Sequence, residues 1–241
     1  MSMQDKLIGI HQPNLFPWLG YFSKIVKSDS FVFLDHVANN PRTAIYTKRV
    51  QLISNGQAHW LTIPLKNKKG ETFVPINAME IDNPEQIESK HLKTIELTYK
   101  KAPHFNEVFE HVLNFYKHPS PLISERNIDF IKAICTQLGI TKEFTLSSNL
   151  HCTENSTELL IEIIKQLKGT TYLSGDGADG YQEEELYKSN RISLTFSNFK
   201  HPVYPQFNSK EFLKGLSIID CLMNAGFKRT KKLLYESPIT L

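Results

Sequence analysis

Residues 7–35, LIGIHQPNLFPWLGYFSKIVKSDSFVFLD, decide the fold. The two apolar runs in this stretch, residues 7–10 and 31–34, are typical of buried strands. Pro13 ends the first run, because proline cannot donate a hydrogen bond to a neighbouring strand. Residues 20–27 carry apolar side chains at helical spacing. A strand, a crossover helix and a second strand make a βαβ unit, so the stretch predicts an α/β protein with a parallel sheet.

Polar side chains follow both of these strands. His11 and Gln12 come directly after the first strand, Asn14 lies two residues further on, and Asp35 follows the second. Ligands of open parallel sheets bind beyond the carboxyl ends of the strands, so the sequence predicts a binding site here. His11 is the candidate general base, because imidazole titrates near neutral pH. Asp35 is the second candidate catalytic residue, and Gln12 and Asn14 are candidate substrate ligands.

The loop between the first strand and the helix is rich in aromatic residues. Trp18 and Tyr21 are candidates to stack on a sugar or a base. Gly20 opens the helix, whose first backbone N–H groups would face an anion. The alternative is that the aromatic side chains plug the end of the sheet, and Phe16 and Phe22 have the character of core residues.

Composition limits the class of protein. The chain has 241 residues, and 40% of them are hydrophobic, which is enough for a folded core. Its net charge of +3 is low for a protein that binds nucleic acid. No apolar stretch approaches the roughly 20 residues that span a bilayer. Three scattered cysteines predict a reduced, cytoplasmic setting.

The sequence predicts no metal site. His104, His111 and His118 recur every seven residues. Seven helical residues rise about 10.5 Å, which is too far for adjacent ligands of one ion. The cysteines also form no chelating pair.

Strands alternate with helices along the rest of the chain. This alternation predicts a mostly parallel, Rossmann-like sheet flanked by helices, within a single domain of residues 1–241. A helical subdomain over residues 84–138 is expected within it. The expected strands are residues 59–65, 74–81, 143–148, 170–174 and 192–196, and the expected helices are residues 84–99, 104–116, 120–138, 156–167 and 209–224.

Several further side chains are candidate substrate ligands. Arg42 and Arg49 follow the second strand, where a guanidinium could bind a phosphate or a carboxylate. The alternative for these cations is a solvated face. His91 lies on a predicted helix, and His201 begins a stiff aromatic turn.

A second loop follows the strand predicted at residues 170–174. Ser174 and Asp176 could hold a ribose or a divalent ion, and Gly175 allows the backbone to approach a ligand closely. The alternative is an ordinary tight loop. A calcium loop would need more oxygen ligands at regular spacing.

Several segments together resemble the WbqC-like protein family: HQPNLFPWLGYFSKI, FVFLD, WLTIP, KHLKTIELTYKKAPHF, TYLSG, HPVYPQF and LSIIDCLMNAG. The resemblance spans nearly the whole chain. It implies a place in the bacterial gene clusters for surface polysaccharide (O-antigen), and a role in glycine transfer has been suggested for the family.

A fainter resemblance concerns mechanism. Residues 18–21, Trp-Leu-Gly-Tyr, occupy the place where nucleotidyltransferases carry His-x-Gly-His. This chain keeps the glycine and replaces both histidines with aromatic residues. Nucleotidyl transfer by the usual route is therefore not expected: His11 or Lys24 would have to substitute, or the site only binds.

Two functions follow from these patterns. The first is a transferase that attaches an aminoacyl (glycyl) or acyl group to an activated sugar. The second is a non-catalytic protein that binds nucleotide sugars or assists assembly. A nucleotide or nucleotide sugar is the expected substrate, no cofactor is identified, and other enzymes of the polysaccharide pathway are possible partners. No Ser–His–Asp or Cys–His signature supports covalent catalysis.

Overall fold

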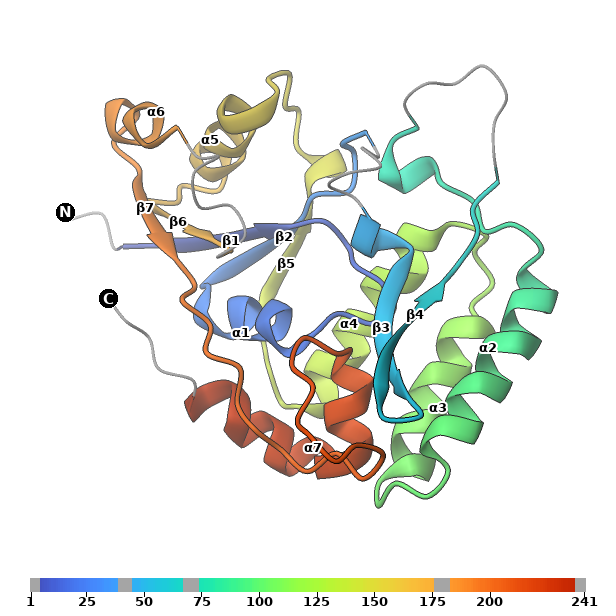
Figure 1. Ribbon diagram of the computed structural model, residues 1–241. Helices are drawn as coiled ribbons and strands as arrows, with labels where there is room; N and C mark the ends of the chain where they lie inside the picture. Colours follow the sequence, from blue (N-terminus) through green and yellow to red (C-terminus); the bar gives the residue numbers. More distant parts are fainter. Residues whose placement is uncertain (1–4, 39–44, 67–73, 176–182, 237–241) are drawn as a thin grey trace.

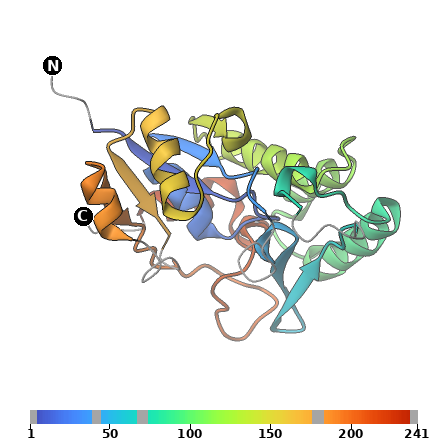
Figure 2. The ribbon, with the colours of Figure 1, turned by 90° about the horizontal axis from the view of Figure 1, so that it is seen from above.

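The computed structural model describes residues 5–38, 45–66, 74–175 and 183–236. Its centre is a five-stranded parallel sheet with helices on both faces (Figure 1, Figure 2). The predicted α/β fold class is therefore confirmed. The strands of this sheet are β1 (Leu7–His11), β2 (Ser30–Phe33), β5 (Glu143–Leu146), β6 (Thr171–Ser174) and β7 (Ser193–Phe196).

Ten helical segments lie in the described part of the chain. The α-helices are α1 (Leu19–Lys27), α2 (Pro84–Tyr99), α3 (Phe105–Tyr116), α4 (Ile123–Gln137), α5 (Ser156–Gln166), α6 (Glu184–Ser189) and α7 (Ile218–Glu236). The short 3-10 helices are η1 (Ile45–Thr47), η2 (Ile76–Ala78) and η3 (Ser147–Asn149).

The strand order of the sheet is β5-β2-β1-β6-β7, and every neighbouring pair is parallel. The chain adds β2 and then β5 on one side of β1, and later adds β6 and then β7 on the other side. The order therefore reverses between β1 and β6. In open α/β sheets the crevice at such a reversal, beyond the carboxyl ends of the strands, is where ligands bind.

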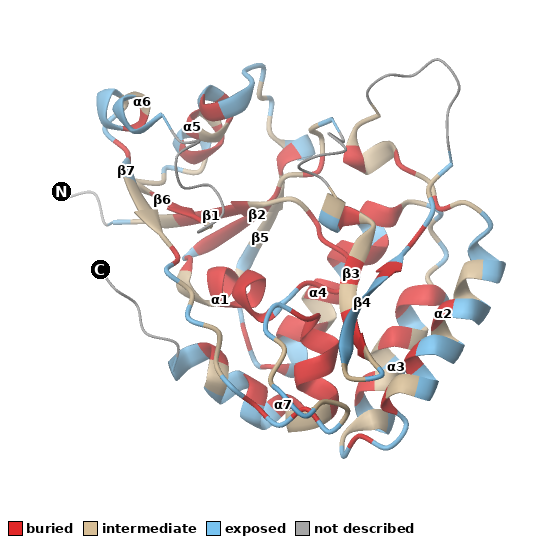
Figure 3. Ribbon diagram, viewed as in Figure 1, coloured by how far each residue is buried: buried red, intermediate tan, exposed pale blue. Residues whose placement is uncertain are grey.

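Alternate side chains of the strands pack into two different cores. Ile8, Ile10 and Val32 face a smaller core shared with α5 and α6. Phe31 and Phe33 face a larger core that includes residues of α1, α4 and α7. Each apolar side chain fully buried in this way stabilises the fold by about 1.5–3 kcal/mol. Figure 3 shows the buried strands between the buried faces of the two helical layers.

The helices α2, α3 and α4 occupy the range predicted as a helical subdomain. Ile95 of α2, Val108 of α3 and Ile131 of α4 belong to the same large core as Phe22 of α1. The division of the chain into one domain with a helical subdomain stays a prediction.

A two-stranded antiparallel ribbon lies apart from the five-stranded sheet. It consists of β3 (Arg49–Ser54) and β4 (Gln57–Thr62) (Figure 1). Asn55 and Gly56 form the turn, with φ angles of 50° and 74°. Two successive positive φ angles are typical of a type I′ hairpin turn, which suits Asn-Gly. The strand predicted at residues 59–65 is therefore half of a hairpin and ends earlier, at Thr62.

Two predicted elements were wrong. Residues 74–81 form the 3-10 helix η2 and isolated bridges, because the N–H groups of Ile76 and Asn77 bond to the carbonyls of Val37 and Asp35 instead of a strand partner. The last helix was predicted at residues 209–224, but it begins at Ile218, and a kink at Gly226 interrupts it. Gly226 has φ of 72° and ψ of 169°, and the chain resumes a helical path beyond it to Glu236.

A buried hydrogen-bond network joins α7 to α2 and to the segment of residues 204–206, which precedes α7. Asp220 Oδ1 accepts from the Tyr99 hydroxyl at 2.9 Å. Asp220 Oδ2 accepts from the Tyr204 hydroxyl at 2.9 Å and from Gln206 Nε2 at 3.0 Å. Burial raises the pKa of the Asp220 carboxyl above its usual value, although the three donors oppose this shift. The Tyr-x-Gln pattern of residues 204–206 therefore serves packing in this region.

We expect Asp220→Ala to lower the free energy of unfolding by about 3 kcal/mol or more, because three buried donors lose their acceptor. Urea unfolding followed by circular dichroism measures this change. Asp129→Ala is the matched control, because Asp129 is exposed and pairs with His118 at the surface. That control should change stability by less than about 1 kcal/mol. Equal losses in the two variants would contradict the assignment.

Candidate functional site

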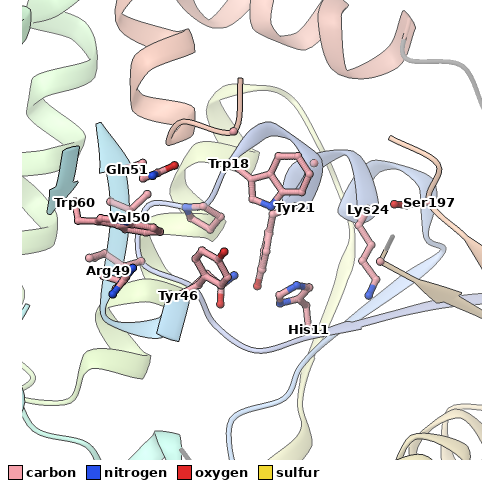
Figure 4. A pocket seen from close by; sticks show the side chains of 16 residues that line it. His11, Trp18, Tyr21, Lys24, Tyr46, Arg49, Val50, Gln51, Trp60 and Ser197 are labelled. Carbon is pink, nitrogen blue, oxygen red and sulfur yellow. The ribbon is translucent and has the colours of Figure 1, made fainter. Parts of the chain in front are cut away.

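A cavity of about 440 Å³ lies beyond the carboxyl end of β1, between the start of α1 and the β3–β4 ribbon (Figure 4). Its volume falls within the range of about 300–1,000 Å³ that is usual for small-molecule sites. The polar and aromatic residues that line it, together with glycines, are His11, Asn14, Trp18, Gly20, Tyr21, Lys24, Tyr46, Arg49, Gln51, Trp60, Gly175, Ser197 and Gly215.

His11 is the last residue of β1 and projects into this cavity. Its Nδ1 atom lies 3.1 Å from the carbonyl oxygen of Gln12. A carbonyl only accepts hydrogen bonds, so Nδ1 is the protonated nitrogen and Nε2 is left as an acceptor. Burial and, next, the charge of Lys24 lower the pKa of His11 to about 3. The imidazole is therefore neutral at neutral pH.

The lining of the cavity carries positive charge. Lys24 is buried, and its Nζ atom donates to the carbonyl of Ile10 at 2.6 Å. The start of α1 lines the same cavity, and the helix dipole is positive at this end. Arg49 adds a second cation from the ribbon. None of the described residues that line the cavity is an aspartate or a glutamate, so the site favours an anionic ligand.

The indole of Trp18 covers Gly20 at the start of α1. A Cβ atom placed on Gly20 would lie 2.4 Å from Cη2 of Trp18. On its other side Trp18 stacks with His201, with ring centroids 6.3 Å apart and an angle of 25° between the planes. His201 in turn lies 3.0 Å from the carbonyl of Pro202 through Nδ1. His201 therefore supports the wall that Trp18 forms and does not itself line the cavity.

The structure brings together most of the predicted ligands from the first loop and several from elsewhere. The cavity lining includes the predicted residues His11, Asn14, Trp18, Gly20, Tyr21, Arg49 and Gly175. Gln12 does not line the cavity, but its carbonyl accepts from the Tyr21 hydroxyl at 3.0 Å and lies beside His11. Ser174 is buried directly beneath this edge, at the end of β6. Arg42 and Asp176 lie outside the described residues.

Asp35 lies at the same edge of the sheet as His11 and Ser174, but its carboxylate does not line the cavity. Its Oδ1 atom accepts from Ser147 Oγ at 2.9 Å and from the Ser148 N–H at 2.8 Å. Its Oδ2 atom accepts from Ser148 Oγ at 2.7 Å. These bonds hold the 3-10 turn that follows β5, so the geometry gives Asp35 a positioning role.

His91 is also away from the cavity. It is buried between α2 and α3, where its Nδ1 atom lies 2.8 Å from the Tyr116 hydroxyl. Burial and the nearby charge of Lys90 lower its pKa to about 4. The ring joins two helices of the large core, so no part of it is presented to a ligand in the cavity.

The sequence reasoning missed the wall that the ribbon supplies. Tyr46, Gln51 and Trp60 line the cavity, and none of the three was a predicted ligand. Residues 55–56, Asn-Gly, were the available signal, because that pair between two strand-forming runs predicts a hairpin. That signal predicts the ribbon, whereas the tertiary structure decides that the ribbon faces the loop that follows β1.

Comparisons with known proteins show the family of this chain. The model that describes the WbqC-like protein family matches residues 12–232. The chain belongs to the WbqC-like protein family. It is 28% identical over 233 residues to Rv1507c, a protein of Mycobacterium tuberculosis (strain ATCC 25618 / H37Rv). The aligned residues cover 95% of this chain and 98% of that relative. The name of that relative states no activity. No solved structure matches the chain.

Two kinds of feature are absent from the described residues: a metal-binding cluster and a membrane-spanning helix. No three histidine, cysteine, aspartate or glutamate side chains in that part of the chain gather closely enough to hold a metal ion. Within the same residues no helix combines the length and the apolar character needed to cross a bilayer.

We expect Gly20→Ala to displace the Trp18 indole, because the new methyl group would overlap the ring. The chain has two tryptophans, so Trp60→Phe leaves Trp18 as the single fluorescent indole. In that background Gly20→Ala should shift the emission of Trp18 to longer wavelength. Gly175→Ala is the matched control, because a Cβ there meets nothing within 4 Å. Identical spectra of all three proteins would contradict the contact.

We also expect the protein to lose stability as pH falls below about 6.5, towards about 3. The unfolded chain protonates His11 near its ordinary pKa, whereas the folded chain resists protonation, so acid favours unfolding. His11→Gln should reduce this loss, measured by urea unfolding at about pH 7 and about pH 4.5. His91→Gln should act in the same direction, because the pKa of His91 is lowered to about 4. An unchanged pH dependence in His11→Gln would contradict the buried neutral imidazole.

Proposed function

We propose that the protein is a transferase of bacterial surface-polysaccharide biosynthesis that attaches an aminoacyl (glycyl) or acyl group to an activated sugar. The observation that carries this proposal is the placement of neutral His11 beside Lys24 and the start of α1, in a cavity at the strand-order reversal. The family resemblance to proteins of O-antigen gene clusters supports the pathway. The positive charge of the lining supports a phosphate-bearing substrate.

In this proposal each group at the inner end of the cavity has one task. Lys24 binds a phosphate of the activated sugar, near the positive end of the α1 dipole. The sugar amine or hydroxyl attacks the acyl carbonyl of the donor, and its proton passes to Nε2 of His11. The bond to the leaving group of the donor then breaks, and that group departs with the electron pair and takes the proton from His11.

The low pKa of free His11 is compatible with this role. Its second cause is the positive charge of Lys24, which disfavours an imidazolium beside it. Burial is the larger cause, but a bound phosphate would offset the charge of Lys24 and so raise the pKa of His11 from its value in the free protein. The carbonyl of Gln12 accepts from both His11 and Tyr21 and so holds the two rings in a fixed relation.

A second function is a non-catalytic protein that binds nucleotide sugars. The specific observation in its favour is that the pKa of His11 is lowered to about 3, which makes the free imidazole a weak base. The aromatic residues that replace both histidines of the His-x-Gly-His pattern also favour binding alone. Steady turnover with a panel of nucleotide sugars and acyl or aminoacyl donors separates the two functions.

We expect His11→Ala to lower the transfer rate about a hundredfold or more, which is typical when a general base is removed. Its thermal melting should stay close to that of the parent protein, because a cavity-lining side chain contributes about 1 kcal/mol or less. Complementation of surface polysaccharide in cells provides a second readout. His59→Ala is the matched control, because His59 is exposed on the ribbon and does not line the cavity. Full activity of His11→Ala would remove His11 from the mechanism.

A further inference from the structure

Four side chains form a second recognition surface at the other end of the cavity, which we call the stacking platform: Tyr46, Arg49, Gln51 and Trp60. Tyr46 comes from η1, and the other three come from the two strands of the ribbon. Figure 4 shows this group across the cavity from Lys24 and His11, with Trp18 and Tyr21 between the two ends. The platform is therefore separate from the groups that the transfer step uses.

The guanidinium of Arg49 lies over an aromatic ring in this platform. The central carbon of its guanidinium is 3.7 Å from the centroid of the Trp60 ring. Its Nε atom is buried and has no hydrogen-bond partner among the described residues. A planar cation stacked on an indole extends the stack, because a further planar ring packs well on a guanidinium or on the indole.

Two large aromatic side chains of the platform are exposed. Trp60 is 42% exposed and Tyr46 is 52% exposed, and their ring centroids are 6.1 Å apart. Exposed aromatic side chains that gather at a cavity are typical of a binding surface. Ser217, which precedes α7, donates its backbone N–H to the carbonyl of Gln51 at 2.9 Å. This bond helps to fix the position of Gln51 on β3.

The platform is tied firmly to the loop that follows β1. The N–H of Leu15 donates to the carbonyl of Tyr46 at 2.9 Å. Asn127 of α4 is buried, and its Nδ2 atom donates at 2.9 Å to the carbonyls of both Pro13 and Thr47. The loop after β1 and the segment that carries Tyr46 are thus bonded to each other directly and also through Asn127. These bonds fix the platform relative to His11.

The chemistry of the platform favours a nucleobase over a sugar ring. A sugar presents C–H groups, which pack on the electron-rich face of an aromatic ring but gain nothing from a cationic guanidinium. A nucleobase stacks on both. The Gln51 side-chain amide offers a donor and an acceptor together, which match the edge of a base. Its side chain makes no hydrogen bond within the described ranges.

We propose that the stacking platform binds the base of a nucleoside diphosphate, so that the activated sugar is a nucleotide sugar with its base on the ribbon and its diphosphate directed towards Lys24. This inference rests on the proposed function in naming the substrate class of the same cavity. It does not require that transfer occurs.

Calorimetric titration of the full chain tests the assignment. The probes are the 5′-diphosphates of adenosine, cytidine, guanosine and uridine, and inorganic pyrophosphate, which carries the same charged groups without a base. At least one nucleoside diphosphate should bind about tenfold or more tightly than pyrophosphate, because base stacking adds to affinity. Trp60→Ala should remove about tenfold or more of that affinity and leave pyrophosphate binding unchanged.

Further variants separate loss of binding from loss of folding, and none of these measurements requires catalysis. Tyr46→Ala should act in the same direction as Trp60→Ala, and thermal melting confirms that each variant is folded. Tyr235→Ala is the matched control, because Tyr235 is 55% exposed on α7 and does not line the cavity. Lys24→Met should weaken pyrophosphate and nucleoside diphosphates by the same factor.

Three outcomes would overturn the base subsite. These are no binding of any of the four nucleotides, equal affinity for pyrophosphate and every nucleotide, and equal losses for both kinds of probe in Trp60→Ala. Failure of the proposed transfer reaction looks different. In that case a nucleotide binds and depends on Trp60, but no donor and acceptor pair is turned over, which leaves the base subsite in place.

Discussion

The parallel pairing of β1 with β2 on one side and with β6 on the other is the constraint on which the rest of the structure depends. Parallel neighbours require crossover connections, and these crossovers supply the helices of both layers. Because the strand order reverses at β1, the segments that follow β1 and β6 diverge to opposite sides. The space that opens between them cannot be filled by the sheet itself, and it becomes the cavity.

The electrostatics of this cavity follow from burial as much as from the choice of residues. Lys24 is almost fully buried and is held by the carbonyl of Ile10, at the end of the same strand that carries His11. A cation fixed so close, together with burial, keeps His11 neutral. The site therefore combines the acceptor nitrogen of His11 with the positive charge of Lys24. This combination suits a phosphate-bearing ligand whose reacting group carries a proton to give up.

Buried polar side chains far from the sheet set the shape of the cavity. Asn127 bonds to one carbonyl on each of two facing segments. Asp220 gathers the hydroxyls of Tyr99 and Tyr204 where α7 begins, close to Ser217, whose N–H bonds to the ribbon. A buried donor without a partner costs free energy of folding. Such networks therefore favour a single arrangement of the segments around them. The helices of residues 84–137 thus help to position a ribbon that is remote from them in the chain.

The sequence by itself determined the α/β class, the βαβ unit of residues 7–35 and the edge at which His11 and Ser174 lie, because strand and helix periodicity and the carboxyl ends of strands are local properties of the chain. It also indicated the family, through motifs spread over nearly the whole chain. Only the tertiary structure decided that Asp35 supports a turn, that His91 joins two helices, and that Tyr46, Gln51 and Trp60 complete the cavity. Those outcomes depend on which segments meet in space. A polar side chain has the same appearance in sequence whether its partner is a neighbouring serine or a ligand.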